Sequence, residues 1–129
     1  MDKNIYLFIT MIFLHLIADY NMQGILAQMK QKQWWIEDCA KKNLSFNKYQ
    51  HDYIVALLEH SFEWSFIVML PCLIGNVSST ANIIIAILAN TIGHFIIDDL
   101  KANKLKINLL QDQLFHLLQI IVTFVVLSF

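Results

Sequence analysis

Apolar residues fall into four long runs separated by polar segments. The runs cover about residues 4–27, 52–74, 80–101 and 107–129. At about 1.5 Å per residue, a helix of that length can cross a hydrocarbon core of about 30 Å. Only three Gly and one Pro occur in the 129 residues, so strands and tight turns have little support. The pattern predicts an all-α fold, a four-helix transmembrane bundle formed by a single integral-membrane domain.

The polar segments carry most of the positive charge. Eight of the nine lysines lie at residues 30–50 or 101–106, and these two segments share one side of an up-down bundle. The other side has Lys3, both termini and the uncharged turn at 75–79, where Ser79 or Thr80 is expected to cap the third helix. The positive-inside rule then predicts a multi-pass protein of the inner (plasma) membrane with both termini extracytoplasmic.

Composition narrows the choice of partners. The net charge of −1 and the lack of arginine give no reason to expect nucleic acid. Cys39 and Cys72 lack metal-type spacing, so neither a disulfide framework nor a thiolate site is predicted.

The first apolar run has no small-residue cleavage site and is expected to stay in the mature protein. Trp34 and Trp35 suit a headgroup boundary, where the 30–50 loop could form a short interfacial helix.

Each apolar run contains a histidine and an acid at helical spacing. The pairs are His15 with Asp19, His60 with Glu63, His94 with Asp98, and Asp112 with His116. Residues three or four apart lie on one face of a helix. In an alternating bundle all four pairs fall in the cytoplasmic half of their spans, so we expect them to converge on one shared site.

A metal ion would compensate for these buried charges. Each charged group at membrane depth costs about 2.5–3.5 kcal/mol on insertion scales and is rarely left facing lipid. Imidazole and carboxylate ligands suit zinc, with iron or manganese as alternatives. We predict one or two divalent ions, and two would lie about 3.5–4 Å apart as in two-metal hydrolytic sites. The predicted ligands are His15, Asp19, His60, His94, Asp98, Asp112 and His116, and Glu63 or Asp99 is the candidate general base.

The motifs around these residues carry a family resemblance that spans nearly the whole chain. They are HLIADY at 15–20 followed by Gln23, an isolated His60, HFIID at 94–98 followed by Lys101, and DQLFH at 112–116. In them the chain resembles domain-of-unknown-function family 3307, small bacterial and phage membrane proteins. The resemblance implies four membrane helices and no established activity, and Glu63 matches no position of its pattern. A distant similarity in ligand style to putative membrane-bound metal-dependent hydrolases, and beyond them to helical zinc phospholipases, favours hydrolysis by analogy.

Several functions remain open at this level. The first is a metal-dependent hydrolase of a membrane lipid or phosphoester, and the alternative is a small metal-ion or proton transporter or channel that uses the same residues. A haem-binding electron carrier is a third reading, which the acids beside each histidine disfavour. The polar groups could also serve only as hydrogen bonds between helices. Gln23 and Gln119 could orient a ligand or substrate or bond between helices.

The third run also has a row of small side chains at helical spacing. They are Ala86, Ala89, Asn90 and Gly93. Small residues let a neighbouring helix approach closely, so a homodimer is one expectation.

Overall fold

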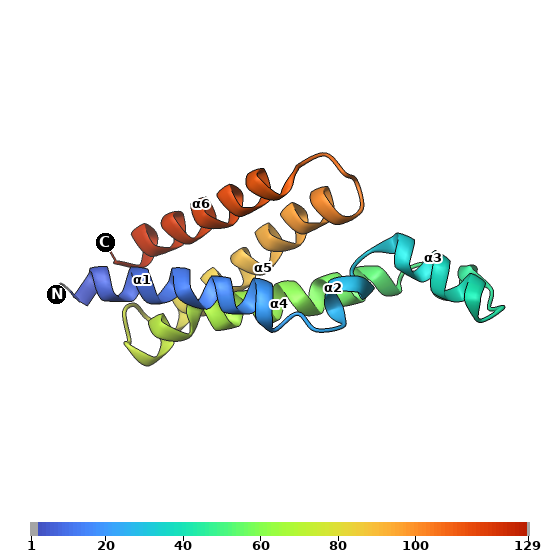
Figure 1. Ribbon diagram of the computed structural model, residues 1–129. Coiled ribbons are helices and arrows are strands. Elements are labelled where there is room, and N and C mark those ends of the chain that lie inside the picture. Colours follow the sequence, from blue (N-terminus) through green and yellow to red (C-terminus); the bar gives the residue numbers. More distant parts are fainter. Residues whose placement is uncertain (1–2, 129) are drawn as a thin grey trace.

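The computed structural model describes residues 3–128, which are mostly helical and contain no β-strand. Its long elements are α1 (Lys3–Leu16) continued by the π-helical turn η1 (Ile17–Asn21), α4 (Asp52–Ile74), α5 (Thr80–Ala102) and α6 (Leu109–Ser128). The resulting four helices are long and apolar enough to cross a membrane. α1 packs against α4 and α6, while α5 packs against α4 and α6, so the four close into a bundle (Figure 1). The prediction of an all-α protein with four potential membrane spans is confirmed.

The bundle has polar groups inside and apolar groups outside. His94, Asp112 and His116 have no exposed surface, whereas Ile92 and Val126 are more than 60% exposed. A water-soluble bundle has the opposite distribution, because its apolar stripe faces the core. An apolar exterior around helices that satisfy their own backbone hydrogen bonds suits a lipid environment.

Side-chain caps set where two of the spans begin. Ser79 Oγ accepts a hydrogen bond from the Asn82 backbone N–H at 3.2 Å, which confirms the predicted cap of α5. At the start of α6, Gln111 N–H donates to Asn108 Oδ1 at 2.9 Å, and Asn108 N–H donates to Gln111 Oε1 at 3.0 Å. This reciprocal pair is a capping box, and it fixes the helical turn that carries Asp112.

The first span ends earlier than predicted. The expected span covered residues 4–27, but the continuous helix ends at Asn21. Its last turn is π-helical, with Met22 N–H bonded to Ile17 O at 3.1 Å, five residues back. The chain then turns at Gly24, which has a φ of +50°, a conformation that glycine adopts without strain. Residues after the turn form the short helix α2 (Leu26–Met29).

The polar loop folds as a separate arm. It contains α3 (Lys32–Lys41) and η2 (Phe46–Lys48), and it projects beyond one end of the bundle (Figure 1). Trp35 packs edge-on against Trp34, with ring centroids 5.0 Å apart, and stacks on Tyr49 at 6.2 Å. The aromatic rings therefore hold the arm together, while their predicted place at the headgroup boundary stays a prediction.

Small residues of α5 serve contacts within the chain. Asn90 Nδ2 donates to Thr123 Oγ1 at 2.9 Å, and Gln119 Nε2 donates to Asn90 O at 2.7 Å. At Gly93 an added Cβ would lie 3.0 Å from Gln119 Nε2, so this glycine lets α6 approach closely. Gln119 thus bonds between helices, and the predicted homodimer stays a prediction.

Candidate metal centre

Six of the seven predicted ligands come together inside the bundle. They are Asp19 of η1, His60 of α4, His94 and Asp98 of α5, and Asp112 and His116 of α6. All six are buried. They form three overlapping groups whose potential ligand atoms lie within 4.8 Å of one another: Asp19, His60 and His94; His94, Asp98 and His116; and Asp19, Asp112 and His116. The predicted convergence of His and Asp side chains from all four spans is therefore present.

The spacing of these atoms fits a coordination shell. Nε2 of His60 and Nε2 of His94 are 3.2 Å apart. His116 Nε2 lies 3.3 Å from Asp98 Oδ1 and 3.4 Å from Asp112 Oδ1. Two ligands about 2.0–2.1 Å from a tetrahedral zinc ion are about 3.3–3.4 Å from each other, whereas a relaxed N–H···O hydrogen bond spans about 2.9 Å. These separations are compatible with ligands arranged around a small cation.

Stacked rings set the orientation of two ligands. The Trp64 ring lies 4.3 Å from the His94 ring, and the His94 ring lies 4.1 Å from the His116 ring, with interplanar angles of 21° and 23°. Within residues 3–128, Nδ1 of His94 and Nδ1 of His116 have no hydrogen-bond partner. Ring packing and the contacts of the two Nε2 atoms, with no bond at Nδ1, therefore orient these imidazoles.

His15 has a role different from the predicted one of metal ligand. Its Nδ1 accepts a hydrogen bond from Trp64 Nε1 at 2.9 Å, and its Nε2 lies 3.2 Å from Gln113 Oε1. Because an indole nitrogen only donates, the His15 proton resides on Nε2 and is donated to Gln113. Both ring nitrogens are thus engaged, and His15 is outside the three groups.

Gln113 links His15 to two acids by hydrogen bonds. With its oxygen held by His15, its Nε2 donates to Asp19 Oδ2 at 2.8 Å and to Asp112 Oδ2 at 3.0 Å. Gln23 Nε2 adds a hydrogen bond to Asp19 Oδ1 at 3.0 Å and one to the Asp19 carbonyl. Sequence reasoning missed Gln113, although it lies within the DQLFH motif. Such contacts to ligands fix their position and charge.

Two lysines form ion pairs with carboxylates of the cluster. Lys30 Nζ is 2.6 Å from Asp98 Oδ2, and Lys101 Nζ is 2.6 Å from Asp112 Oδ2. The Lys30 side chain is only 10% exposed, and that of Lys101 is 35% exposed. These lysines were interpreted from sequence as determinants of topology, but in the fold they are part of the site.

Asn103 holds Lys30 in place at the end of α5. Asn103 Nδ2 donates to Lys30 O at 3.1 Å, and Asn103 Oδ1 accepts from Lys32 N at 2.8 Å. The segment at 22–31 is thereby fastened to the end of the bundle. Lys30 therefore reaches Asp98 from a segment that the hydropathy pattern divided between the first span and the polar loop.

A cavity of about 400 Å³ opens beside the cluster. Its lining includes Asp19, Asp98, Lys30 and Lys101, together with Gln23. The two aspartates are buried, whereas the side chain of Lys101 is partly exposed, so the cavity leads from the surface to candidate ligands. A small molecule can therefore reach the cluster from the end of the bundle where the arm lies.

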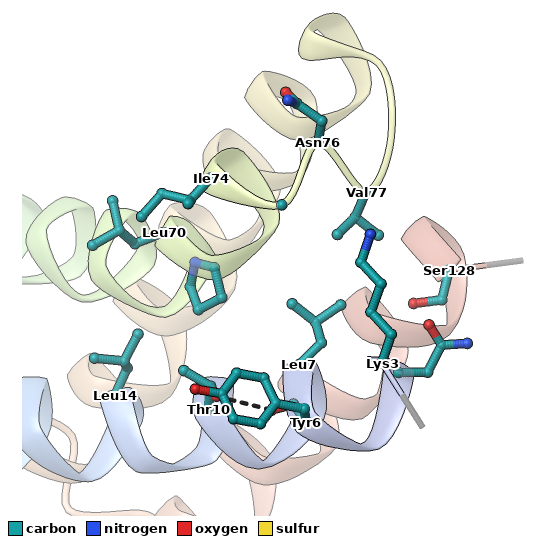
Figure 2. A pocket seen from close by; sticks show the side chains of 13 residues that line it. Lys3, Tyr6, Leu7, Thr10, Leu14, Leu70, Ile74, Asn76, Val77 and Ser128 are labelled. Carbon is teal, nitrogen blue, oxygen red and sulfur yellow. Dashed lines mark hydrogen bonds between the residues drawn. The ribbon is translucent and has the colours of Figure 1, made fainter. Parts of the chain in front are cut away.

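A second cavity lies at the other end. It has a volume of about 640 Å³ and lies between the start of α1 and the turn after α4, where Leu7, Ile74 and Val77 border it (Figure 2). Among the residues described, the two cavities have no lining residue in common. The apolar core includes the buried side chains of Met11 and Cys72, whose sulfur atoms are 3.9 Å apart. The cluster is thus open toward one end.

The two predicted general bases lie outside the three groups. Asp99 Oδ2 is 2.7 Å from Lys104 Nζ, and Asp99 Oδ1 accepts from Asn103 Nδ2 at 3.0 Å. Glu63 is partly exposed on α4, because Trp64 and His60 occupy the buried face of that helix. These positions give no support to their predicted role, which stays a prediction.

The ligand set indicates which ions could bind. Imidazole nitrogens and carboxylate oxygens suit zinc, manganese or iron, and the three groups contain no thiolate. The 3.2 Å between the Nε2 atoms of His60 and His94 leaves no room for a porphyrin between them.

Comparison of the chain with protein-family models, with curated proteins and with solved structures gave no match.

Proposed function

We propose that this chain is a multi-pass protein of the inner (plasma) membrane with a divalent metal centre near the cytoplasmic side. The proposed topology is up-down with both termini extracytoplasmic. It is supported by the lysines at 30–50 and 101–106, since they lie at the end of the bundle where the cavity opens. Zinc is the first candidate ion, and manganese and iron are the alternatives.

We infer that the centre is that of a metal-dependent hydrolase acting on a lipid or phosphoester. The observation that carries this is the set of buried His and Asp atoms at coordination-shell spacing beside an open cavity. A divalent ion held there supplies Lewis acidity, which makes water a nucleophile near neutral pH. The similarity in ligand style to putative membrane-bound metal-dependent hydrolases agrees with this by analogy.

In the proposed reaction, Asp112 is the proton acceptor. With an ion held by His94, Asp98 and His116, Asp112 keeps an oxygen, Oδ1, that is buried and has no hydrogen-bond partner in the described part of the chain. We assign this oxygen to accept the proton of the attacking water. The water oxygen forms the new bond to phosphorus or to the ester carbon, and the bond to the leaving oxygen breaks. The proton then passes to the leaving alcohol, so the reaction balances.

A channel would need access to the cluster from both ends at once, whereas an alternating-access transporter opens one end at a time. The cavity at the cluster and the larger one at the other end have no residue in common among those described. The buried side chains of Met11, Val68 and Met69 belong to the apolar core. Access from one end supports hydrolysis over a channel.

The proposal is tested by measuring metal content and hydrolysis on the same preparations. Purified protein in detergent is treated with chelator, reloaded with zinc or manganese, and tested for release of phosphate or fatty acid from lipid substrates. We expect one or two equivalents of metal and metal-dependent hydrolysis, with both lost in His94→Ala. The matched control is His51→Ala, because His51 is exposed and outside the cluster.

Two results would contradict the proposal. One is a folded protein that retains no metal, and the other is hydrolysis that persists in His94→Ala. Metal uptake into proteoliposomes without hydrolysis would favour the transporter instead.

A further inference from the structure

The charge of the cluster changes sign when metal binds. Asp19, Asp98 and Asp112 carry three negative charges, and Lys30 and Lys101 carry two positive ones. With the imidazoles neutral, as metal ligands are, one net negative charge remains. A single divalent ion makes the site net positive, and a second ion makes it strongly so. A buried site with excess positive charge favours an anionic ligand, because charges taken out of water need a partner.

The two lysines are placed to hold such an anion. Each ammonium group lies 2.6 Å from a carboxylate oxygen of a predicted metal ligand. A cation held by Asp98, with Asp112 beside it, attracts the same carboxylate charges and weakens the hold of these acids on the lysines. Both lysines line the cavity of about 400 Å³, so their ammonium groups, once held less tightly by the acids, can turn toward a molecule in that cavity. Asn103 keeps Lys30 there through its two hydrogen bonds to the backbone of Lys30 and Lys32.

We propose that Lys30 and Lys101 form a subsite for the phosphate group of the substrate, next to the metal centre. This inference rests on the proposed metal centre and deepens it by naming the substrate class. Lysine is a point-charge donor that commonly binds phosphate, and phosphate oxygens accept charge-assisted hydrogen bonds about twice as strong as neutral ones. A neutral ester would leave the excess positive charge unpartnered.

The cavity lining also favours an amphiphilic molecule. Tyr20 and Leu105 line it and are more than half exposed. These apolar surfaces could accompany the chains of a lipid whose headgroup enters between the lysines. Inorganic phosphate and a phosphatidate headgroup present the same chemistry, so the experiment has an arm for each.

The test uses full-length protein loaded with Mn²⁺, whose paramagnetism broadens the ³¹P resonance of a phosphate bound next to it. Inorganic phosphate is added in one arm, and phosphatidate in mixed micelles in the other. We expect broadening in at least one arm, and an apparent affinity at least tenfold weaker in Lys30→Gln and in Lys101→Gln. The matched control is Lys104→Gln, because Lys104 pairs with Asp99 and is outside the cavity lining. Its affinity should equal that of the unmodified chain.

The outcomes separate this inference from the metal centre. Protein that retains neither Mn²⁺ nor zinc overturns both. If it retains zinc alone, the same two titrations are followed by calorimetry on the zinc-loaded variants, with the same ranking expected. Retained Mn²⁺ without ³¹P broadening in either arm overturns the phosphate subsite and leaves the metal centre standing. Equal affinity in all three lysine variants, or equal loss in all three, also overturns it. Broadening confined to phosphatidate supports a lipid substrate, and broadening confined to inorganic phosphate supports a soluble one.

Discussion

Lys30→Gln removes a positive charge that lies 2.6 Å from Asp98 in a nearly closed part of the site, and we expect opposite effects without and with metal. In the metal-free protein the Asp98 carboxylate loses its ammonium partner. Removing one member of a buried ion pair costs about 3–5 kcal/mol. His60 and His116 stay within 3.4 Å of this carboxylate, so we expect the lower end, about 3 kcal/mol of unfolding free energy.

With metal bound, Lys30→Gln is expected to be favourable rather than unfavourable. An ion bound to Asp98 at about 2.0–2.2 Å would lie within about 5 Å of the ammonium nitrogen. At an effective dielectric of about 20, a divalent and a monovalent charge at that distance repel by about 6–7 kcal/mol. Lys30 can move into the cavity, where water screens it, so we expect at least about 1.4 kcal/mol of this to remain. Lys30→Gln should therefore bind metal at least about tenfold more tightly than the unmodified chain.

Two assays check both halves of this prediction. Thermal unfolding in detergent with chelator should show Lys30→Gln melting below the unmodified chain, and added zinc should restore it. Competition with a fluorescent zinc indicator should give the tighter dissociation constant. Lys104→Gln is the control, because that side chain is 54% exposed and its pairing with Asp99 contributes little to stability. Metal affinity that is unchanged or weaker in Lys30→Gln would refute the reasoning.

Three further substitutions test the supporting contacts. Trp64→Phe leaves His15 Nδ1 without its donor and should weaken metal affinity by about 10–100-fold, as for other supports of metal ligands, in an indicator titration; unchanged affinity would contradict this. Asn103→Ala removes two hydrogen bonds to the backbone of Lys30 and Lys32 and one to Asp99, and should cost about 1–3 kcal/mol. Hydrogen exchange at residues 22–31 should become faster with unchanged metal stoichiometry; slow exchange there would count against the fastening role. Gly93→Leu overpacks the contact with Gln119 and should cost about 1–3 kcal/mol, measured by chemical unfolding; a stability equal to that of the unmodified chain would exclude a close approach there.

Regular helices made part of the site predictable from sequence. His94 and Asp98, like Asp112 and His116, lie four residues apart in uninterrupted α-helices, so the spacing alone places each pair on one face. Their meeting across the bundle followed from the high cost of leaving charged groups in lipid.

Irregular backbone and tertiary contacts made the rest unpredictable. His15 bonds to Trp64 and Gln113, which reach it from other helices, so its own spacing from Asp19 does not reveal its partners. Lys30 reaches Asp98 only because the chain turns after Asn21 and is fastened by Asn103. A hydropathy pattern contains neither of these contacts, so it indicates a role for Lys30 in topology or in attracting an anionic headgroup or substrate but does not place it beside Asp98.

The most direct test of a metal centre built from nitrogen and oxygen ligands is zinc-edge X-ray absorption on the reloaded protein. We expect a first shell of nitrogen and oxygen at about 2.0–2.1 Å with the outer scattering of imidazole, and no sulfur at about 2.3 Å. Cys39 and Cys72 are the available thiols, and neither belongs to the three groups. A sulfur shell, or a nitrogen and oxygen shell that is unchanged in His94→Ala, would contradict the centre described here.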